Sequence, residues 1–407
     1  MQESIKFTVI IPTRERANTL FYSLRTVVAQ DYKDLTILVS DNFSQDNTRQ
    51  VVDFFHDPRI KYINTEKRLS MTHNFEFALS HIKDGWVAFI GDDDGLLPEA
   101  LNTVADVIRK TGCQAIMSNL CFYNWPGIPV NEGLLTVPLN KGIELRNARA
   151  WLSKVMRGQA SYLELPITYT GGFINSQIIE KARSGEGLFY SSVNPDAYST
   201  IALASVLDNY VMLKEPVAIS GASTHSIGTS WMGVTKNDFF QKFLSEGIIP
   251  FDSRVRTKDW PKDWPKSPSL HLYECYLQSE HLHHDFLKIK MEDQLGLALS
   301  RSTPEWYDNL RKYCVEIAQQ NKIDMVIVDR KEKEFRQGEF FRHWEEIISR
   351  GLKYLFMQGK EFGIHDVYEA SIAIRAIFLF KTRYSNWLLT KTIRRIGKCL
   401  RVSKGGL

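Results

Sequence analysis

The sequence lacks the features that mark membrane-spanning, secreted and disulfide-stabilised proteins. None of its apolar runs reaches the roughly eighteen residues that a transmembrane helix needs. The N-terminal segment MQESIKFTVIIPT has no basic stretch followed by an apolar one, so a secretory signal is not expected. The five cysteines include no C-x-x-C pair, and an odd number argues against a set of disulfides. A reducing cytoplasm is the expected compartment.

A net positive charge is found only at the C-terminal end of the sequence. The formal net charge is +4, but residues 371–407 contain nine Lys and Arg side chains and no Asp or Glu. The other 370 residues hold 42 basic and 47 acidic side chains, a net charge of −5. The basic footprint that a nucleic-acid-binding protein shows is therefore missing from the body of the chain, and no nucleic-acid partner is expected.

The first 120 residues alternate between strand-like and helix-like patterns. We predict strands at 7–11, 35–39, 60–63, 86–90 and 115–120, and helices at 18–29, from 44 or 46 onward, at 70–81 and from 98 onward. This alternation predicts an α/β fold with an open, mostly parallel sheet flanked by helices. Ligands bind such sheets at the carboxyl ends of the strands. Neither a G-x-G-x-x-G nor a Walker loop follows the first strand, so a phosphate group would need another partner, such as a metal ion.

Polar residues follow three of the predicted strands. The segment 13–16 (TRER) comes after the first strand, Asp41 after the second, and Asp92, Asp93 and Asp94 after the fourth. Adjacent carboxylates raise one another's pKa values, and a divalent cation with a preference for oxygen ligands, Mg²⁺ or Mn²⁺, relieves that conflict. In an extended chain Asp92 and Asp94 point to one side and Asp93 to the other. The alternative is a polar loop whose aspartates cap the helix near Pro98.

The rest of the chain divides by pattern. Residues 121–230 are irregular, with a tight turn at 171–174, a helix near 195–207 and a strand near 217–220. The segment 257–268 repeats D-W-P-K and is too rich in proline for a helix or a central strand. Residues 269–365 read as helical. We therefore predict a catalytic unit at 1–235, a linker or surface strap at 236–268 and a helical C-terminal region at 269–407 whose tail spans 371–404.

Three segments together resemble glycosyltransferase family 2. They are Val9–Thr13 (VIIPT), Val39–Thr48 (VSDNFSQDNT) and Phe89–Asp94 (FIGDDD) with Pro98, and the resemblance covers roughly residues 5–225. It implies an inverting, metal-dependent enzyme with the GT-A fold, here followed by a mainly helical C-terminal region. The three motifs are specific in combination, because their order, spacing and strand-end placement all agree.

The resemblance also implies roles for individual residues. The donor nucleotide would be bound by Pro12, Thr13, Arg14, Asp41, Asn74, Asp92 and Asp93, and the metal, Mn²⁺ or Mg²⁺, by Asp94, Asp92 and His225. Simpler roles stay open for several of them: helix capping for Asp41 and Ser44, a surface position for Asn74, and a structural role for His225. Lys67 and Arg68 could meet the diphosphate or be exposed loop charges.

An inverting transfer also needs a general base for the acceptor hydroxyl. By the resemblance, this carboxylate stands at the start of a helix, where Asn194-Pro195-Asp196 occurs, so Asp196 is the expected base. Its ordinary alternative is a first-turn carboxylate favoured by the helix dipole. Glu186 and then Asp208 are the rivals. The cluster of His281, His283 and His284 is interpreted as a solvated helix face, since it lacks metal-ligand spacing.

The basic tail has an amphipathic pattern. Leu389, Ile393, Ile396 and Leu400 share one helical stripe, and Lys391, Arg394, Arg395 and Lys398 lie opposite. Such a helix can lie on an anionic membrane surface, or it can pack its apolar stripe on the body of the protein.

The expected function is transfer of a sugar from a nucleotide-diphosphate donor, UDP-sugar first, to a saccharide or lipid-linked glycan acceptor in the synthesis of a bacterial surface polysaccharide such as a capsule or O-antigen. The expected place is the cytoplasm or the inner face of the membrane, and a homo-oligomer is plausible on general grounds. Two alternatives remain: a non-catalytic nucleotide-sugar or glycan binding module, and a nucleotidyltransferase.

Overall fold

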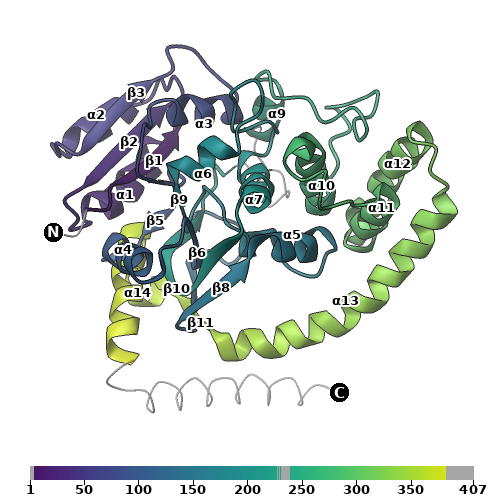
Figure 1. Ribbon diagram of the computed structural model, residues 1–407. Helices are drawn as coiled ribbons and strands as arrows, with labels where there is room; N and C mark the ends of the chain where they lie inside the picture. Colours follow the sequence, from purple (N-terminus) through teal and green to yellow (C-terminus); the bar gives the residue numbers. More distant parts are fainter. Residues whose placement is uncertain (1–3, 227, 229, 231–238, 382–407) are drawn as a thin grey trace.

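The computed structural model describes residues 4–226, 228, 230 and 239–381, and it is built around one large mixed sheet (Figure 1). Along the main path the strand order is β11-β7-β6-β9-β4-β1-β2-β3. The strands of this path are β1 (Phe7–Thr13), β2 (Leu35–Asp41), β3 (Ile60–Asn64), β4 (Trp86–Phe89), β6 (Ala115–Asn124), β7 (Leu134–Pro138), β9 (Gly172–Asn175) and β11 (Tyr354–Gln358). A long strand, β10 (Asn209–Ala222), pairs with β6, β5 (Gly95–Leu96) and β8 (Ile143–Asn147).

The parallel part of the sheet is the part that the sequence predicts. Strands β1, β2, β3 and β4 run parallel, and β10 runs parallel to β6. The strand direction reverses at β9, which is antiparallel to both β4 and β6. The expected fold class, a mostly parallel sheet with helices and a helical C-terminal region, is therefore confirmed, with an antiparallel strand inserted beside β4.

Helices cover both faces of the sheet. The helices up to residue 206 are α1 (Ala17–Val28), α2 (Thr48–Phe54), α3 (Met71–Leu79), α4 (Ala100–Thr111), α5 (Ala148–Met156), α6 (Ser176–Lys181) and α7 (Pro195–Val206). Helix α7 packs against α3, α5 and α6, while α1 contacts the C-terminal helix α14 (Val367–Lys381). Because both faces are covered, β1 reads as a continuous apolar run, and Val9, Ile10 and Ile11 are completely buried.

The C-terminal helices add to the same core. They are α9 (Phe239–Leu244), α10 (Pro268–Gln278), α11 (Met291–Ser300), α12 (Pro304–Gln320) and α13 (Met325–Lys353), with 3-10 turns at Tyr162–Glu164, Glu280–Leu282 and Gly359–Phe362. One cluster of buried side chains joins Phe89 of the sheet, Tyr198 of α7, Leu270 of α10 and Leu310 of α12. The domain boundaries given above stay predictions, because this cluster runs across them.

The expectation of helix throughout 269–365 is wrong at one place. Tyr354–Gln358 (YLFMQ) forms strand β11 directly after α13 and pairs antiparallel with β7. A five-residue apolar run cannot be assigned to helix or strand by periodicity, and the free edge of β7 decides it. Within the segment 257–268, Thr257 and Trp264 are buried, while Lys258 and Lys262 are exposed. The role of this segment as a linker or surface strap stays a prediction.

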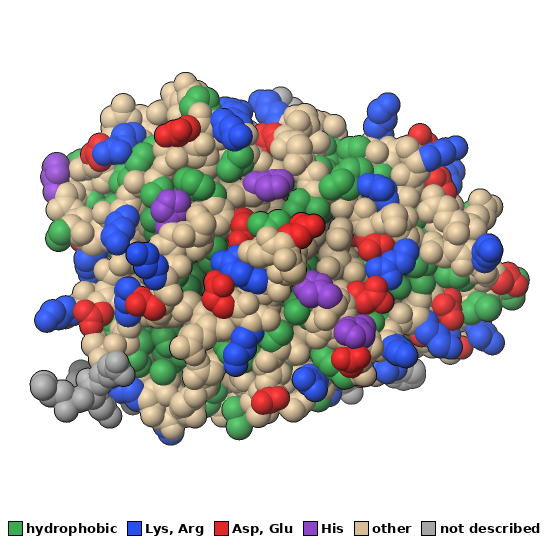
Figure 2. Space-filling model, turned by 45° about the horizontal axis from the view of Figure 1, so that its top comes forward, with side chains coloured by type: hydrophobic (Ala, Val, Ile, Leu, Met, Phe, Trp, Pro, Cys, Tyr) green, Lys and Arg blue, Asp and Glu red, His purple; other side chains and the backbone are tan. Residues whose placement is uncertain are grey.

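No helix within the described residues is long and apolar enough to cross a membrane. The stripe of Leu389, Ile393, Ile396 and Leu400 lies outside the described residues. The described end of the C-terminal region packs on the body: Val367, Ala370 and Ile374 of α14 are buried with Leu135 and Trp125. On the face shown in Figure 2, Lys and Arg side chains are interspersed with Asp and Glu.

Candidate active site

Two adjoining cavities lie at the carboxyl ends of the parallel strands. The first, of about 360 Å³, is lined by the loop after β1 (Pro12 to Arg16), by Asn74 of α3 and by Asp92; we call it the loop cavity. The second, of about 340 Å³, contains Asp93, Asp196 and many aromatic side chains; we call it the aromatic cavity. Arg16, Met71, Phe75, Tyr169 and Phe243 line both cavities, so the two share a wall.

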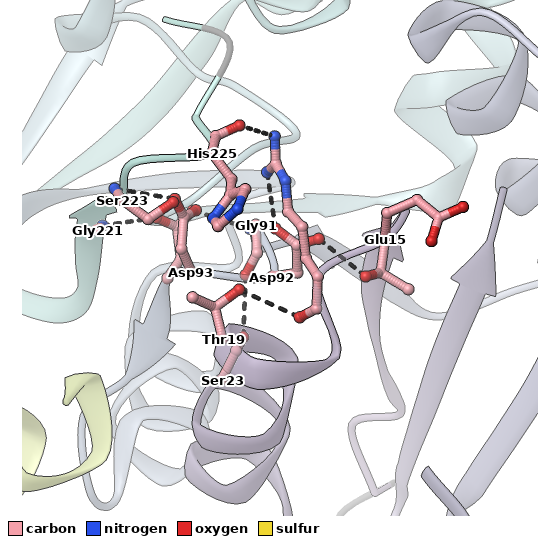
Figure 3. Close-up of polar contacts among 12 residues, drawn as sticks. Glu15, Thr19, Ser23, Gly91, Asp92, Asp93, Gly221, Ser223 and His225 are labelled. Atoms are coloured by element: carbon pink, nitrogen blue, oxygen red, sulfur yellow. Dashed lines mark hydrogen bonds and ion pairs between the residues drawn. The ribbon is translucent and has the colours of Figure 1, made fainter. Parts of the chain in front are cut away.

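Asp92 is neutralised by the loop after β1. Its Oδ1 accepts a 2.9 Å bond from Arg16 Nη1, and its Oδ2 accepts a 2.8 Å bond from the Thr13 hydroxyl (Figure 3). Arg16 also donates to the backbone carbonyl of His225. Burial lowers the pKa of Arg16, but the negative charges of Asp92 and Asp93 outweigh it and leave that pKa above its usual range. The ion pair fixes the β1 loop against the turn after β4.

Asp94 is held by the fold. Its Oδ2 accepts from the backbone N–H of Gly91 at 2.8 Å and from the Thr170 hydroxyl, and its Oδ1 accepts from the N–H of Gly221 at 2.7 Å. The side chain is 2% exposed and lines neither cavity. Asp94 therefore ties together the turn after β4, the loop before β9 and the end of β10.

The expectation that Asp92 and Asp94 point to the same side is wrong. It assumed an extended chain, but Gly91 to Asp94 form a turn in which the Asp94 N–H donates to the Gly91 carbonyl at 3.1 Å. The turn sends Asp92 to the loop cavity, Asp93 to the aromatic cavity and Asp94 into the body of the protein. The side-chain alternation of a strand does not apply in a turn.

Asp93 is the least compensated of the three carboxylates. Its Oδ2 accepts from the hydroxyl of Ser223 at 2.7 Å and from the Ser223 N–H at 3.3 Å (Figure 3). Burial, and then the negative charge of Asp94, raises the pKa of the Asp93 carboxyl well above its usual range. A buried carboxylate with a raised pKa next to a cavity is the place where a bound cation would be stabilised most.

A metal ion would not be held by the protein alone. In the described ranges 4–226, 228, 230 and 239–381, no three His, Cys, Asp or Glu side chains converge in an arrangement that could bind one. Mg²⁺ is commonly bound through one or two carboxylates plus substrate phosphates. The chain fits a metal of that kind, because Asp92 and Asp93 reach the two adjoining cavities.

His225 lies close to Asp92 and Asp93 in Figure 3, but the contacts of its imidazole are not those of a metal ligand. Its Nδ1 lies 3.3 Å from the Thr224 hydroxyl, and its backbone carbonyl receives Arg16. Burial and the Arg16 charge lower its pKa, which keeps the ring neutral. His225 lines neither cavity. Its role as a ligand stays a prediction.

The other predicted donor-binding residues divide in two groups. Pro12, Thr13, Arg14 and Asn74 line the loop cavity, and Arg68 does so as well. Asp41 does not: it accepts from Tyr62, Asn64 and the N–H of Ser44. The capping alternative is wrong for Asp41, because α2 begins at Thr48 and its cap position is Asn47. Asn42, the neighbour of Asp41, lines the cavity in its place.

Arg14 already has a partner in this structure. Its Nη1 lies 2.6 Å from Glu246 Oε2, just beyond α9, and both side chains are largely buried. Arg14 and Glu246 therefore form an ion pair, but Glu246 Oε2 accepts no hydrogen bond among the described residues. Lys242 and Glu246 both line the loop cavity.

Asp196 occupies the second position of α7 and lines the aromatic cavity. Pro195 precedes it at the first helical position, where proline is favoured because its missing N–H needs no partner there. Burial raises the pKa of the Asp196 carboxyl, and the backbone N–H groups at the helix start oppose that rise. The rivals Glu186 and Asp208 are exposed and line neither cavity.

Helix α10 fixes the turn that presents Asp196. His271 Nε2 lies 2.9 Å from the Pro265 carbonyl and Nδ1 lies 3.1 Å from Asn194 Nδ2, so Nε2 carries the proton and Nδ1 accepts. Burial lowers the pKa of His271 to about 4, so the ring is neutral. Glu274, fully buried on the same helix, accepts from the Ser192 hydroxyl at 2.5 Å.

The interpretation of His281, His283 and His284 as a solvated face is wrong for one residue. His281 and His284 are exposed, but His283 is 1% exposed. Its ring stacks on Tyr276 at 4.2 Å, and its Nε2 lies 2.9 Å from the Tyr276 carbonyl. His283 is a packed residue of the turn after α10.

One segment of the chain matches a known family. Residues 8–161 match the sequence profile of Glycosyl transferase family 2. These residues belong to glycosyltransferase family 2. The family 2 segment contains the loop after β1, Asn74 and the turn with Asp92, Asp93 and Asp94. It does not contain Asp196, Trp264 or Phe243.

Two curated relatives of this chain are glucosyltransferases by name. The chain is 38% identical over 102 residues to "GalNAc(5)-diNAcBac-PP-undecaprenol beta-1,3-glucosyltransferase" of Campylobacter jejuni, covering 24% of this chain and 33% of that protein. It is 28% identical over 112 residues to "UDP-Glc:alpha-D-GlcNAc-diphosphoundecaprenol beta-1,3-glucosyltransferase WfgD" of Escherichia coli, covering 28% of this chain and 44% of that protein. The chain thus spans less than half the length of either relative.

Among solved structures, the chain is similar to the crystal structure of S. aureus TarS 1-349 in complex with UDP-GlcNAc. The TM-score is 0.47 and the identity 17%, with 82% of this chain and 92% of that chain covered.

Several residues of the candidate site could not be predicted from the sequence. Arg16 was visible in the polar segment after the first strand, but nothing marked it as the partner of Asp92. Tyr169 and Phe243 line both cavities without any sequence motif. Trp264 lies in the repeated D-W-P-K segment. That repeat indicated a linker or surface strap and did not predict that Trp264 lines a cavity.

The buried Glu274 generates a prediction about pH and stability. Burial raises the pKa of this carboxyl from 4.5 to about 7, so the folded state keeps a proton that the unfolded state has lost. Stability therefore falls as pH rises from about 4.5 to about 7 and changes no further above that range on account of this group. Glu274→Gln removes the effect. Urea denaturation at several pH values should show the variant gaining stability relative to the native protein across that window; parallel pH profiles for the two proteins would contradict the assignment.

Proposed function

We propose that this chain is a metal-dependent, inverting glycosyltransferase that transfers a sugar from a nucleoside diphosphate donor, UDP-sugar first, to a saccharide or lipid-linked glycan acceptor. The family supports transfer of a glycosyl group. The names of the two relatives support a donor such as UDP-Glc and acceptors linked through diphosphate to undecaprenol. A capsule, an O-antigen or a related surface polymer is the proposed product.

One observation carries the proposal. Asp93 and Asp196 line the same cavity, and that cavity shares the wall of Arg16 and Tyr169 with the loop cavity. A nucleoside diphosphate in the loop cavity would meet the loop after β1, Asn74 and Arg68, with its diphosphate toward Arg16. The sugar would then extend past Tyr169 into the aromatic cavity, where Asp196 faces it.

The turn after β4 would hold the proposed cation. The geometry supports Asp93, with Asp92, rather than Asp94 as the protein ligand, because Asp93 and Asp92 line the cavities and Asp94 lines neither. When bound, Mn²⁺ or Mg²⁺ would neutralise the charge that develops on the departing diphosphate. Arg16 adds a fixed positive charge to the same region without needing the ion.

Asp196 is the proposed general base. As the acceptor hydroxyl attacks the anomeric carbon of the donor, a new C–O bond forms, the bond to the diphosphate breaks, and the hydroxyl proton moves to the carboxylate of Asp196. A carboxylate whose pKa is raised by burial holds that proton better than an exposed one. His271 and Asn194 act as positioning residues, since they fix the turn before α7.

The proposed cellular setting follows from the acceptor. A lipid-linked glycan would bring the reaction to the inner face of the membrane, and the basic tail with Lys391, Arg394, Arg395 and Lys398 would contact anionic lipid there. Self-association is a further part of the proposal.

The direct test is transfer from a panel of UDP- and GDP-sugars to a lipid-diphosphate-linked N-acetylglucosamine, followed by mass spectrometry. We expect Asp196→Asn to lower kcat by about 10²–10⁴-fold, the usual contribution of a positioned base, while UDP binding is retained. Asp208→Asn and Glu186→Gln are matched controls, since those carboxylates are exposed, and both should transfer normally. Normal turnover by Asp196→Asn, or loss of turnover in the Asp208 variant, would refute the assignment of the base.

The ion pair of Arg14 and Glu246 generates a second prediction. Glu246 forms an ion pair with Arg14 and places a negative charge in the loop cavity, where the diphosphate is proposed to bind. Glu246→Gln should therefore raise the affinity for UDP, by about fivefold if the pair is worth about 1 kcal/mol, as measured by calorimetry. Glu361→Gln, an exposed carboxylate outside both cavities, controls for net charge. Equal or weaker UDP binding by the Glu246 variant would show that Arg14 does not meet the nucleotide.

A further inference from the structure

The far wall of the aromatic cavity is built from segments outside the family 2 match. Phe240 and Phe243 come from α9, Trp264 from the segment between α9 and α10, and His271 from α10 itself. The family match ends at residue 161. The nucleotide end of the site comes mostly from the family segment, with Tyr169, Lys242, Phe243 and Glu246 added from later residues. The wall beside Asp196 comes from the C-terminal part of this chain.

Trp264 is the centre of that wall and is rigidly packed. Its ring lies 5.1 Å from Phe251, 5.6 Å from Phe240 and 5.1 Å from His271, measured between centroids. His271 is in turn fixed by Pro265 and Asn194. A side chain held by so many rings contributes a preformed surface, because little conformational freedom remains to be lost on binding.

The aromatic wall contains more polar groups than an ordinary hydrophobic core. The indole N–H of Trp264 has no hydrogen-bond partner among the described residues, although buried tryptophans usually find one. Asp196, Asn194 and Ser226 line the same cavity and bring a few polar groups next to the rings. Small-molecule sites share this composition: mostly apolar and aromatic walls with a few placed polar groups.

The chemistry of the wall fits a sugar ring. A pyranose has an apolar face of C–H groups that can lie on an aromatic ring and an edge of hydroxyl groups that donate and accept hydrogen bonds. Arg16 is the one charged basic residue among the described lining residues, and it is already paired with Asp92. His271 is neutral, so the wall offers no cation for an acidic sugar.

We propose that this aromatic wall, with Trp264 at its centre, is a subsite for an uncharged pyranose ring of the acceptor glycan. The proposal rests on the transferase function proposed above and names the part of the substrate that the C-terminal region recognises. The acceptor ring lies against Trp264, and its attacking hydroxyl faces Asp196. The C-terminal region then selects the acceptor, and the family 2 segment binds the donor.

The kinetic test compares two tryptophans of one segment. Trp260 belongs to the same ring cluster, 6.1 Å from Trp264, but does not line the aromatic cavity, so Trp260→Leu is the matched control. Trp264→Leu should raise the KM for the lipid-diphosphate-linked N-acetylglucosamine about tenfold, since one stacked ring is lost. The KM for the donor and acceptor-free hydrolysis of the donor should not change. An unchanged acceptor KM, or an equal rise in donor KM, would overturn the proposal; the latter result would place the donor sugar on this wall.

A binding test separates this proposal from the transferase proposal. Methyl glycosides of N-acetylglucosamine, N-acetylgalactosamine and glucose are titrated at millimolar concentrations while tryptophan fluorescence is recorded. The native protein and Trp260→Phe should show a saturable change that Trp264→Phe, which keeps a packed ring, does not show. A fluorescence change that depends on Trp264 supports the subsite even if no transfer is detected. No such change with any glycoside overturns it, whether or not the protein is a transferase.

Discussion

The arrangement of both cavities depends on the carboxylate of Asp94. This group receives the N–H of Gly91, the N–H of Gly221 and the hydroxyl of Thr170 within a fully buried position. Those three donors belong to the ends of three different strands or loops, so one side chain joins β4, β10 and the loop before β9. A further Cβ at Gly221 would come within 1.8 Å of the Asp93 carbonyl, which shows how closely the segments approach. The turn that carries Asp92 and Asp93 is rigid because Asp94 anchors it.

The same turn distributes three negative charges in three different environments. Asp92 is compensated by an arginine and a hydroxyl, and Asp94 by backbone N–H groups and a hydroxyl. The side chain of Asp93 accepts from Ser223, and burial together with the nearby charge of Asp94 raises its pKa. A cation brought in with a diphosphate would complete the compensation. The protein alone leaves the negative charge of Asp93 incompletely compensated, and the substrate with its cation would supply the missing positive charge.

The sequence predicted the parts of this site that depend on local pattern. The ends of β1 and β4 and the start of α7 were readable because apolar runs stop at polar residues there, and because Asn194-Pro195 is a helix-start signal. The division of labour among Asp92, Asp93 and Asp94 was not readable, since it depends on a turn and on Gly221, more than a hundred residues away. Trp264 and Phe243 reach the site only through tertiary packing, and β11 formed because β7 had an open edge.

The most direct measurement of the central claim is the electron paramagnetic resonance of Mn²⁺ added to the protein with and without UDP. The account predicts that Mn²⁺ remains largely free without nucleotide, becomes bound when UDP is added, and is no longer retained in Asp93→Asn. Tight Mn²⁺ binding in the absence of any nucleotide, or full UDP-dependent binding in the Asp93 variant, would contradict the claim that Asp93 and the donor diphosphate together hold the metal.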